Sequence, residues 1–199
     1  MVKKLSVGVI GAQGAIIEHV LSMKNALIEN NISGNVFIIE KKHELNEIDA
    51  LILPGGESTT ISKILYDSKF YELILKRIKD DDLPVMGTCA GCVLLASELT
   101  DDSKDIKLLK AMNMKVTRNA FGGQRESFEK NIIIKGFSKP YNAVFIRAPI
   151  IEKVWGKCEV LSKFNGKIIM AREGSLLAIS FHPELTNDLR IHNYFLNII

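Results

Sequence analysis

Cys89 lies at the centre of a G-x-C-x-G pattern, between Gly87 and Gly91. The short apolar run 84–87 precedes it and an apolar stretch with helical spacing follows, so a strand is expected to turn directly into a helix. This arrangement is typical of a nucleophile elbow with Cys in place of Ser, and glycines permit the tight turn that it requires. The positive end of the following helix favours the thiolate, the reactive form of the side chain. Cys89 is therefore the candidate nucleophile, and a structural core cysteine is the alternative.

A cysteine nucleophile needs a base, and His182 is the histidine best placed by its neighbours. It follows the strand-like run 176–181 and precedes Pro183, which biases its backbone towards extended geometry. Residues i and i+2 share a face of an extended segment, so Glu184 is expected beside the His182 imidazole. There the carboxylate would fix the tautomer of the ring and stabilise its protonated form, as the third member of a triad does. A solvated His-Pro-Glu turn is the alternative.

The remaining histidines and a second cysteine offer weaker chemistry. We interpret His19 and His43 as ordinary surface residues, whereas His192 falls in an expected terminal helix. Cys89 and Cys92 form a C-x-x-C pair, which leaves a redox function as an alternative. Cys92 falls inside the expected helix, however, where it can simply pack against apolar neighbours. The sequence holds no second C-x-x-C or C-x-x-H pair to complete four zinc ligands, so no metal site is expected.

A glycine-containing loop, residues 54–58 (PGGES), follows another apolar run at 49–53. Glycines leave backbone N–H groups accessible and allow a ligand to approach closely. The loop can therefore supply an oxyanion hole together with the N–H of Ala90, which directly follows the candidate nucleophile. Pro-Gly-Gly is also common in ordinary turns, and that is the competing interpretation.

Alternating strand-like and helix-like segments predict an α/β fold, a mostly parallel central sheet covered on both faces and extended by antiparallel strands. In the first half, strands are expected at 5–10, 35–39, 49–53 and 84–87, and helices at 15–30, from Ser58 onwards and at 90–99. In the second half, strands are expected at 131–135, 143–147, 159–164, 167–172 and 176–181, before a closing helix at 188–199. Asn165-Gly166 predicts a hairpin turn. No long linker interrupts residues 1–199, so a single domain is expected.

Composition excludes several classes of function. The chain has 199 residues, and its 26 Lys and Arg against 23 Asp and Glu give a net charge of +3, too small and too dispersed to indicate a nucleic-acid partner. Its apolar runs are shorter than the roughly 18 residues that a membrane span needs. Three cysteines in a chain of this size predict free thiols and a cytoplasmic protein. The Gly8, Gly11 and Gly14 spacing differs from G-x-G-x-x-G, so no dinucleotide cofactor is expected.

Together these residues resemble the class I (triad) glutamine amidotransferases, and among them the glutaminase subunits of pyridoxal 5'-phosphate synthase. The elbow and His-Pro-Glu belong to the wider superfamily, whereas other stretches are more specific. The matching stretches run in the expected order from end to end: GAQG (11–14), PGGEST (54–59), GTCAG (87–91), RNAFG (118–122), QRESF (124–128), FIRAP (145–149) and SFHPELT (180–186). The chain departs from the family at Gly123, where Arg is usual, and at Ile150, where His is frequent.

The resemblance implies a flavodoxin-like three-layer fold and hydrolysis of L-glutamine to L-glutamate and ammonia through a glutamyl thioester. Cys89 would be the nucleophile and His182 the acid and base, with Glu184 completing the triad. No cofactor is implied. Contacts with glutamine are implied at Gly55, Gly56, Glu57, Ser58, Ala90, Arg118, Ile146 and Arg147.

The resemblance also implies a partner, because free ammonia is of no use without an acceptor enzyme. That partner would be a separate (β/α)8-barrel synthase subunit in a hetero-oligomer, and Gln13 is placed to respond to its docking. Three alternatives remain: the subunit that feeds imidazole glycerol phosphate synthase, a C-x-x-C thiol oxidoreductase, and a catalytically inactive regulatory subunit. The first of these families lacks the FGxQRESF and FIRAP stretches.

Overall fold

The computed structural model describes residues 4–101, 105–118, 120 and 127–199. Within these residues one large sheet runs in the order β2-β1-β3-β4-β12-β11-β9-β6-β5, and β10 pairs with β11 outside that path. The strands of its parallel part are β1 (Leu5–Ile10), β2 (Gly34–Ile39), β3 (Ala50–Leu53), β4 (Val85–Thr88) and β12 (Leu176–Ile179). The others are β5 (Ala96–Leu99), β6 (Met112–Thr117), β9 (Ile150–Val154), β10 (Glu159–Phe164) and β11 (Lys167–Glu173). These extend the sheet mainly through antiparallel pairs, as expected.

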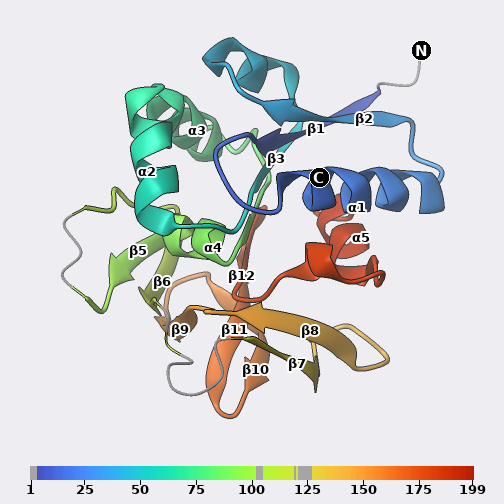
Figure 1. Ribbon diagram of the computed structural model, residues 1–199, viewed down its shortest axis with the longest axis vertical. Helices are drawn as coiled ribbons and strands as arrows, with labels where there is room; N and C mark the ends of the chain where they lie inside the picture. The colour runs from blue at the N-terminus through green and yellow to red at the C-terminus, as the bar shows by residue number, and fades with distance from the viewer. Residues whose placement is uncertain (1–3, 102–104, 119, 121–126) are drawn as a thin grey trace.

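Helices cover both faces of the sheet (Figure 1). α1 (Ile16–Glu29) and α5 (Arg190–Leu196) lie together on one face, while α2 (Ser58–Asp67), α3 (Phe70–Lys79) and α4 (Ala90–Leu95) lie on the other. Short 3₁₀ helices occupy Lys42–Glu47 (η1) and Pro183–Leu185 (η2). A separate antiparallel pair, β7 (Ser127–Ile132) and β8 (Tyr141–Ile146), packs on the side of α1 and α5. The predicted flavodoxin-like α/β architecture is confirmed.

The period of the central strands explains the two-sided core. Side chains of a strand alternate between the faces of the sheet. Along β3, Leu51 and Leu53 join the core beneath α2, α3 and α4, whereas Ala50 and Ile52 join the core beneath α1 and α5. All four of these residues are fully buried, as expected of a parallel strand covered on both sides.

The structure corrects several segments. The helix expected over 90–99 ends at Leu95, and residues 96–99 form β5, which pairs with β6. Every residue of α4 is buried, so no polar face marks where the helix ends. The sequence interpretation also missed α3, β6 and β9. Among the described residues, no helix combines the length and apolar character that a membrane span requires.

Candidate active site

The candidate catalytic residues meet at the carboxyl edge of the parallel strands. In the sheet β4 lies between β3 and β12, with Leu53 paired to Gly87 and Ile179 paired to Thr88. The segments that leave these three strands therefore start side by side, and they carry the Gly55 loop, Cys89 and His182. Open α/β sheets bind ligands at this edge, where loops converge outside the core.

Cys89 occupies a strained turn between β4 and α4. Its backbone has φ +48° and ψ −103°, a conformation that L residues rarely adopt, and its N–H donates to the carbonyl of Ile179 at 2.8 Å. The flanking glycines are required by close packing: a Cβ on Gly87 would lie 2.6 Å from the backbone of Gly91, and a Cβ on Gly91 would lie 2.1 Å from the carbonyl oxygen of Leu53. The sequence thus builds the elbow that its glycine spacing predicts.

His182 and Glu184 form a buried pair. Nδ1 of His182 lies 2.7 Å from Oε1 of Glu184, and a carboxylate can only accept, so Nδ1 carries the hydrogen. The N–H of His182 donates to the carbonyl of Val144 in β8 at 2.8 Å, which fixes the start of the turn. The expected contact is present, but its explanation was wrong. Pro183 begins the 3₁₀ turn η2, and this turn, not an extended segment, brings Glu184 beside the ring.

The pair holds opposite charges. Burial lowers the pKa of His182, but hydrogen bonds with Cys89 and Glu184 outweigh burial and raise that pKa to about 10. Burial raises the pKa of Glu184, yet the hydrogen bond from His182 and the nearby His19 outweigh it, so the pKa of Glu184 is lowered. A charged imidazole beside Cys89 stabilises the thiolate and can donate a proton to a leaving group.

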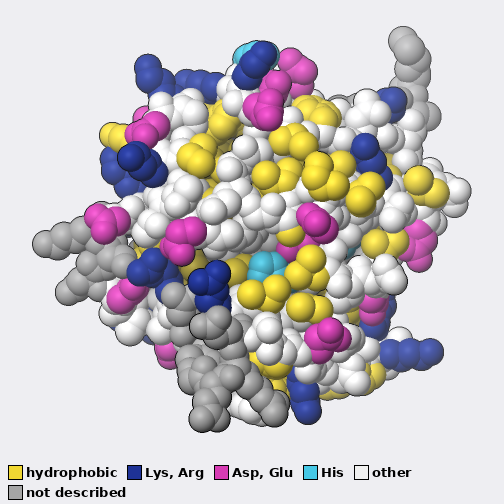
Figure 2. All heavy atoms as spheres, viewed as in Figure 1, with side chains coloured by type: hydrophobic (Ala, Val, Ile, Leu, Met, Phe, Trp, Pro, Cys, Tyr) yellow, Lys and Arg dark blue, Asp and Glu magenta, His cyan; other side chains and the backbone are white. Residues whose placement is uncertain are grey.

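A cavity of about 450 Å³ opens in front of Cys89 and His182. Figure 2 shows a histidine side chain near the centre of this face, between basic side chains and a hydrophobic area. Every candidate site residue except Glu184 lines the cavity, and Glu184 lies behind His182. The sequence interpretation missed four lining residues: Gly14, Ala15, Val93 and Pro149.

Two loops meet on one wall of the cavity. Oε1 of Gln13 accepts a hydrogen bond from the N–H of Glu57 at 3.1 Å. Next to it, Gly14 has φ +96°, and a Cβ at this position would lie 1.9 Å from the carbonyl oxygen of Gly55. The segment after β1 therefore supports the Gly55 loop directly, and both sit beside Cys89.

Arg118 lines the cavity and is also held from outside it. Its guanidinium donates to Asp101 Oδ2 at 2.8 and 3.1 Å, and its Nη1 approaches Ser58 Oγ at 3.4 Å. The ion pair and the cavity position are therefore compatible. Asn119 and residues 121–126, which include Gly123 and much of the family-specific RNAFG and QRESF stretches, lie outside the described residues.

Comparison with known proteins identifies the family. The family model described as the SNO glutamine amidotransferase family matches residues 9–199. This chain belongs to that family. It is 46% identical to the pyridoxal 5'-phosphate synthase subunit PdxT of Staphylothermus marinus and 45% identical to that of Niallia circulans, over 98% of each chain in both comparisons. It is 41% identical to PdxT of Pyrococcus furiosus, over 98% of this chain and 99% of that one.

Solved structures agree with this assignment. A crystal structure of a glutamine amidotransferase, 40% identical in sequence, has a TM-score of 0.86 and covers 96% of this chain and 97% of its own. A second glutamine amidotransferase, from Thermotoga maritima, is 16% identical with a TM-score of 0.64, over 96% of this chain and 80% of its own. At that identity the second structure supports the fold alone.

Within this amidotransferase site, the interpretation of His19 as a surface residue was wrong. His19 lies on α1 and is fully buried, with Nε2 3.0 Å from Thr88 Oγ1 and 3.3 Å from Glu184 Oε2. A signal was available, because His19 shares a helical face with Ile16 and Met23 at spacings of three and four residues. Its polar type hid its position.

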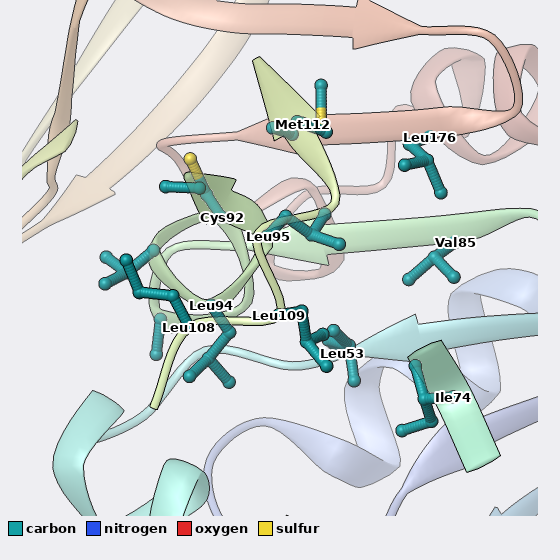
Figure 3. Close-up of a cluster of buried hydrophobic side chains, with 14 of the residues drawn as sticks. Leu53, Ile74, Val85, Cys92, Leu94, Leu95, Leu108, Leu109, Met112 and Leu176 are labelled. Atoms are coloured by element: carbon teal, nitrogen blue, oxygen red, sulfur yellow. The ribbon is translucent and has the colours of Figure 1, made fainter. Parts of the chain in front are cut away.

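Cys92 packs in the core, as its place inside the expected helix predicted. It is fully buried among leucine side chains such as Leu94 and Leu108 (Figure 3). Cys89, Cys92 and Cys158 are free thiols, and burial strongly raises the pKa of Cys92. A buried thiol of this kind is unreactive, so the geometry gives no support to a redox pair.

Proposed function

We propose that this chain is the glutaminase subunit of a pyridoxal 5'-phosphate synthase. It hydrolyses L-glutamine to L-glutamate and ammonia, and the ammonia passes to a separate synthase subunit. One observation carries the proposal. Cys89 lies on a strained elbow beside the buried His182–Glu184 pair, at a cavity in a chain that shares 46% identity with a PdxT subunit.

The triad divides the reaction into two steps. The Cys89 thiolate attacks the side-chain amide carbon, while N–H groups of the Gly55–Gly56 loop and of Ala90 stabilise the negative charge on the oxygen. Protonated His182 gives its proton to the leaving nitrogen, ammonia departs, and a glutamyl thioester remains. Neutral His182 then takes a proton from water, the hydroxide equivalent cleaves the thioester, and glutamate leaves. The starting thiolate and imidazolium are restored.

The rim of the cavity suits an amino-acid substrate. A guanidinium binds a carboxylate through two parallel hydrogen bonds, so we assign the α-carboxylate of glutamine to Arg118. Its ion pair with Asp101 holds the guanidinium at the cavity edge. Residues Glu57, Ser58, Ile146 and Arg147 complete the wall around the substrate.

The ammonia requires an acceptor, which we propose is a (β/α)8-barrel synthase subunit joined to this chain in a hetero-oligomer. The relatives carry the name of a synthase subunit, which supports an assembly of this kind. Gln13 supports a docking response, because its side chain joins the segment after β1 to the loop beside the nucleophile. We further propose that residues 1–199 act as one domain in the cytoplasm, where free thiols persist.

Glutamate release from glutamine tests the function, with the chain alone and with the synthase subunit added. Cys89→Ala is expected to reduce the rate by at least about 1,000-fold, because it removes the nucleophile. Cys92→Ala is the matched control, since it removes the other thiol of the pair and should leave the rate within about threefold. Activity that survives Cys89→Ala would contradict the mechanism, and equal loss in both variants would favour a dithiol reaction.

A further inference from the structure

Glu184 lies between two buried imidazoles. Its Oε1 is 2.7 Å from Nδ1 of His182, and its Oε2 is 3.3 Å from Nε2 of His19. Both the Glu184 and His19 side chains are completely removed from solvent. Oε2 makes no regular hydrogen bond within the described part of the chain. The His19 ring is the polar group placed to stabilise its charge.

The partners of His19 determine which nitrogen carries its hydrogen. A carboxylate oxygen only accepts, so the ring atom that faces it must be N–H, which assigns the hydrogen to Nε2. Thr88 Oγ1, 3.0 Å from the same nitrogen, can share this hydrogen. The opposite ring atom, Nδ1, is buried and has no partner among the described residues, which disfavours an N–H there.

The surroundings keep His19 uncharged. Burial lowers its pKa and outweighs the opposing attraction of Glu184, while the charge of His182 lowers it further and Glu18 raises it slightly. On the side of α5 the His192 ring lies 6.1 Å away at 60°. His192 is equally buried, and burial lowers its pKa to about 3, so it brings no charge. A neutral His19 presents a donor 3.3 Å from Glu184 Oε2 without competing for the negative charge that His182 needs.

We infer that His19 is a positioning residue that acts on His182 through Glu184. By holding Oε2, it fixes the plane of the carboxylate, which in turn fixes the ring of His182 facing Cys89. Without His19, the buried ionised oxygen would have no nearby donor among the described residues, and the carboxylate would rotate or take up a proton. Either change weakens the support that His182 receives in its charged form. This inference rests on the proposed glutaminase function. His19 contacts Glu184 and acts on His182 through it.

Three variants separate positioning from packing. His19→Leu replaces the donor with an apolar side chain, and His19→Gln keeps an N–H near the position of Nε2. His192→Leu removes the neighbouring buried histidine, whose ring nitrogens have no hydrogen-bond partner in the part of the chain that the structure describes. Wild type and Cys89→Ala are assayed beside them with the synthase subunit present. Thermal unfolding of each variant shows whether the chain is folded at the assay temperature.

We expect His19→Leu to lower kcat by about 10- to 100-fold and to leave KM for glutamine within about threefold. The loss is smaller than the roughly 10²- to 10⁴-fold contribution of a general acid and base, because His182 itself is retained. As pH rises, the activity of His19→Leu should also decline at a lower pH than that of wild type, because His182 loses its proton at a lower pH. His19→Gln should recover most of kcat, and His192→Leu should stay within about threefold of wild type. Unchanged kcat in His19→Leu, no recovery in His19→Gln, or equal loss in His192→Leu would overturn the inference.

Nitrogen-15 NMR of the histidine rings provides a readout that needs no activity. We expect His19 to be neutral and protonated at Nε2 at pH 6.5 and above, and His182 to lose its proton at lower pH in His19→Leu than in wild type. A protonated Nδ1 on His19, a charged His19 ring, or an unchanged His182 titration would overturn the inference. If wild type releases no glutamate, the glutaminase proposal fails, whereas these spectra still decide the role of His19.

Discussion

Gly55 lies against both Cys89 and His182. A Cβ at this position would be 2.6 Å from Cε1 of His182 and 3.3 Å from Cβ of Cys89. Because the closest atom belongs to a side chain that can move, we expect Gly55→Ala to displace the imidazole and leave the fold intact. The predicted result is a loss of kcat of at least about tenfold, since small displacements of catalytic groups are costly.

Steady-state kinetics and thermal unfolding together test this substitution. The melting temperature should change by no more than a few degrees, as for a change of about 1 kcal/mol in the free energy of unfolding. Wild-type kcat in Gly55→Ala would contradict the contact. A large fall in melting temperature would instead indicate that the backbone had moved.

Local sequence could single out the candidate catalytic residues because each lies in a short, distinctive pattern. Glycines flank Cys89, and Pro183 links His182 to Glu184 in three consecutive positions. The His19–Thr88 contact joins residues 69 positions apart. Such a contact depends on how α1 crosses the end of β4, which only the folded sheet determines. Periodicity could have indicated that His19 is buried, but not what it binds.

At the scale of the elements, the site depends on two loops in contact. Gly14 combines φ +96° with a Cβ position 1.9 Å from the carbonyl oxygen of Gly55. Gly136 has a similar φ of +89° and an open Cβ position, so Gly136→Ala measures the conformational strain alone, about 1–2 kcal/mol. Gly14→Ala adds a steric clash between the new Cβ and the carbonyl oxygen of Gly55, which should force the loops apart.

We therefore expect Gly14→Ala to reduce glutaminase activity by at least about tenfold and Gly136→Ala to leave activity within about twofold. Rates of glutamate release and urea unfolding curves for the two variants provide the comparison. Equal activities would indicate that the loop after β1 does not support the site.

The order of apolar runs predicted the strands of the parallel part of the sheet, including the fully buried β3. It missed α3, although this helix buries one face through Phe70 and Ile74, and it misplaced the end of α4. In α4 every side chain is buried, so the boundary at Leu95 is set by the pairing of β5 with β6 and not by any local pattern. β9 is likewise held by neighbours distant in sequence, since it lies between β6 and β11. Pairing of this kind is tertiary information.

At the scale of the whole molecule, the core beneath α1 and α5 contains two ionisable side chains. His19 and His192 are fully buried between these helices and the sheet, next to the triad. Burial lowers the pKa of both below the ordinary value of 6.5. The native protein therefore keeps two neutral imidazoles where burial disfavours the charged form, whereas in the unfolded chain water solvates the charged form.

Acid should consequently unfold the protein through these histidines. Below pH 6.5 His192 takes up a proton in the unfolded chain, whereas in the native protein it stays neutral down to about pH 3. The stability that neutral His192 contributes is therefore lost as pH falls through that window. One such group changes the free energy of unfolding by about 1.4 kcal/mol per pH unit, or roughly 2 kcal/mol by pH 5. His182 acts in the opposite direction: its pKa is raised to about 10, so its contribution is complete below pH 6.5 and is lost as pH rises through 10.

Urea unfolding between pH 4.5 and 9 measures both slopes. We expect wild-type stability to be greatest near pH 6.5. On the acid side, the free energy of unfolding of His192→Leu should fall less steeply with pH than that of wild type, by about 1.4 kcal/mol per pH unit, the slope for one proton. His43→Leu is the control, because it removes an exposed histidine outside the core. Parallel acid slopes for wild type and His192→Leu would contradict a neutral buried His192. His19 lies 3.3 Å from Glu184, so it joins this acid sensitivity directly to the His182–Glu184 pair.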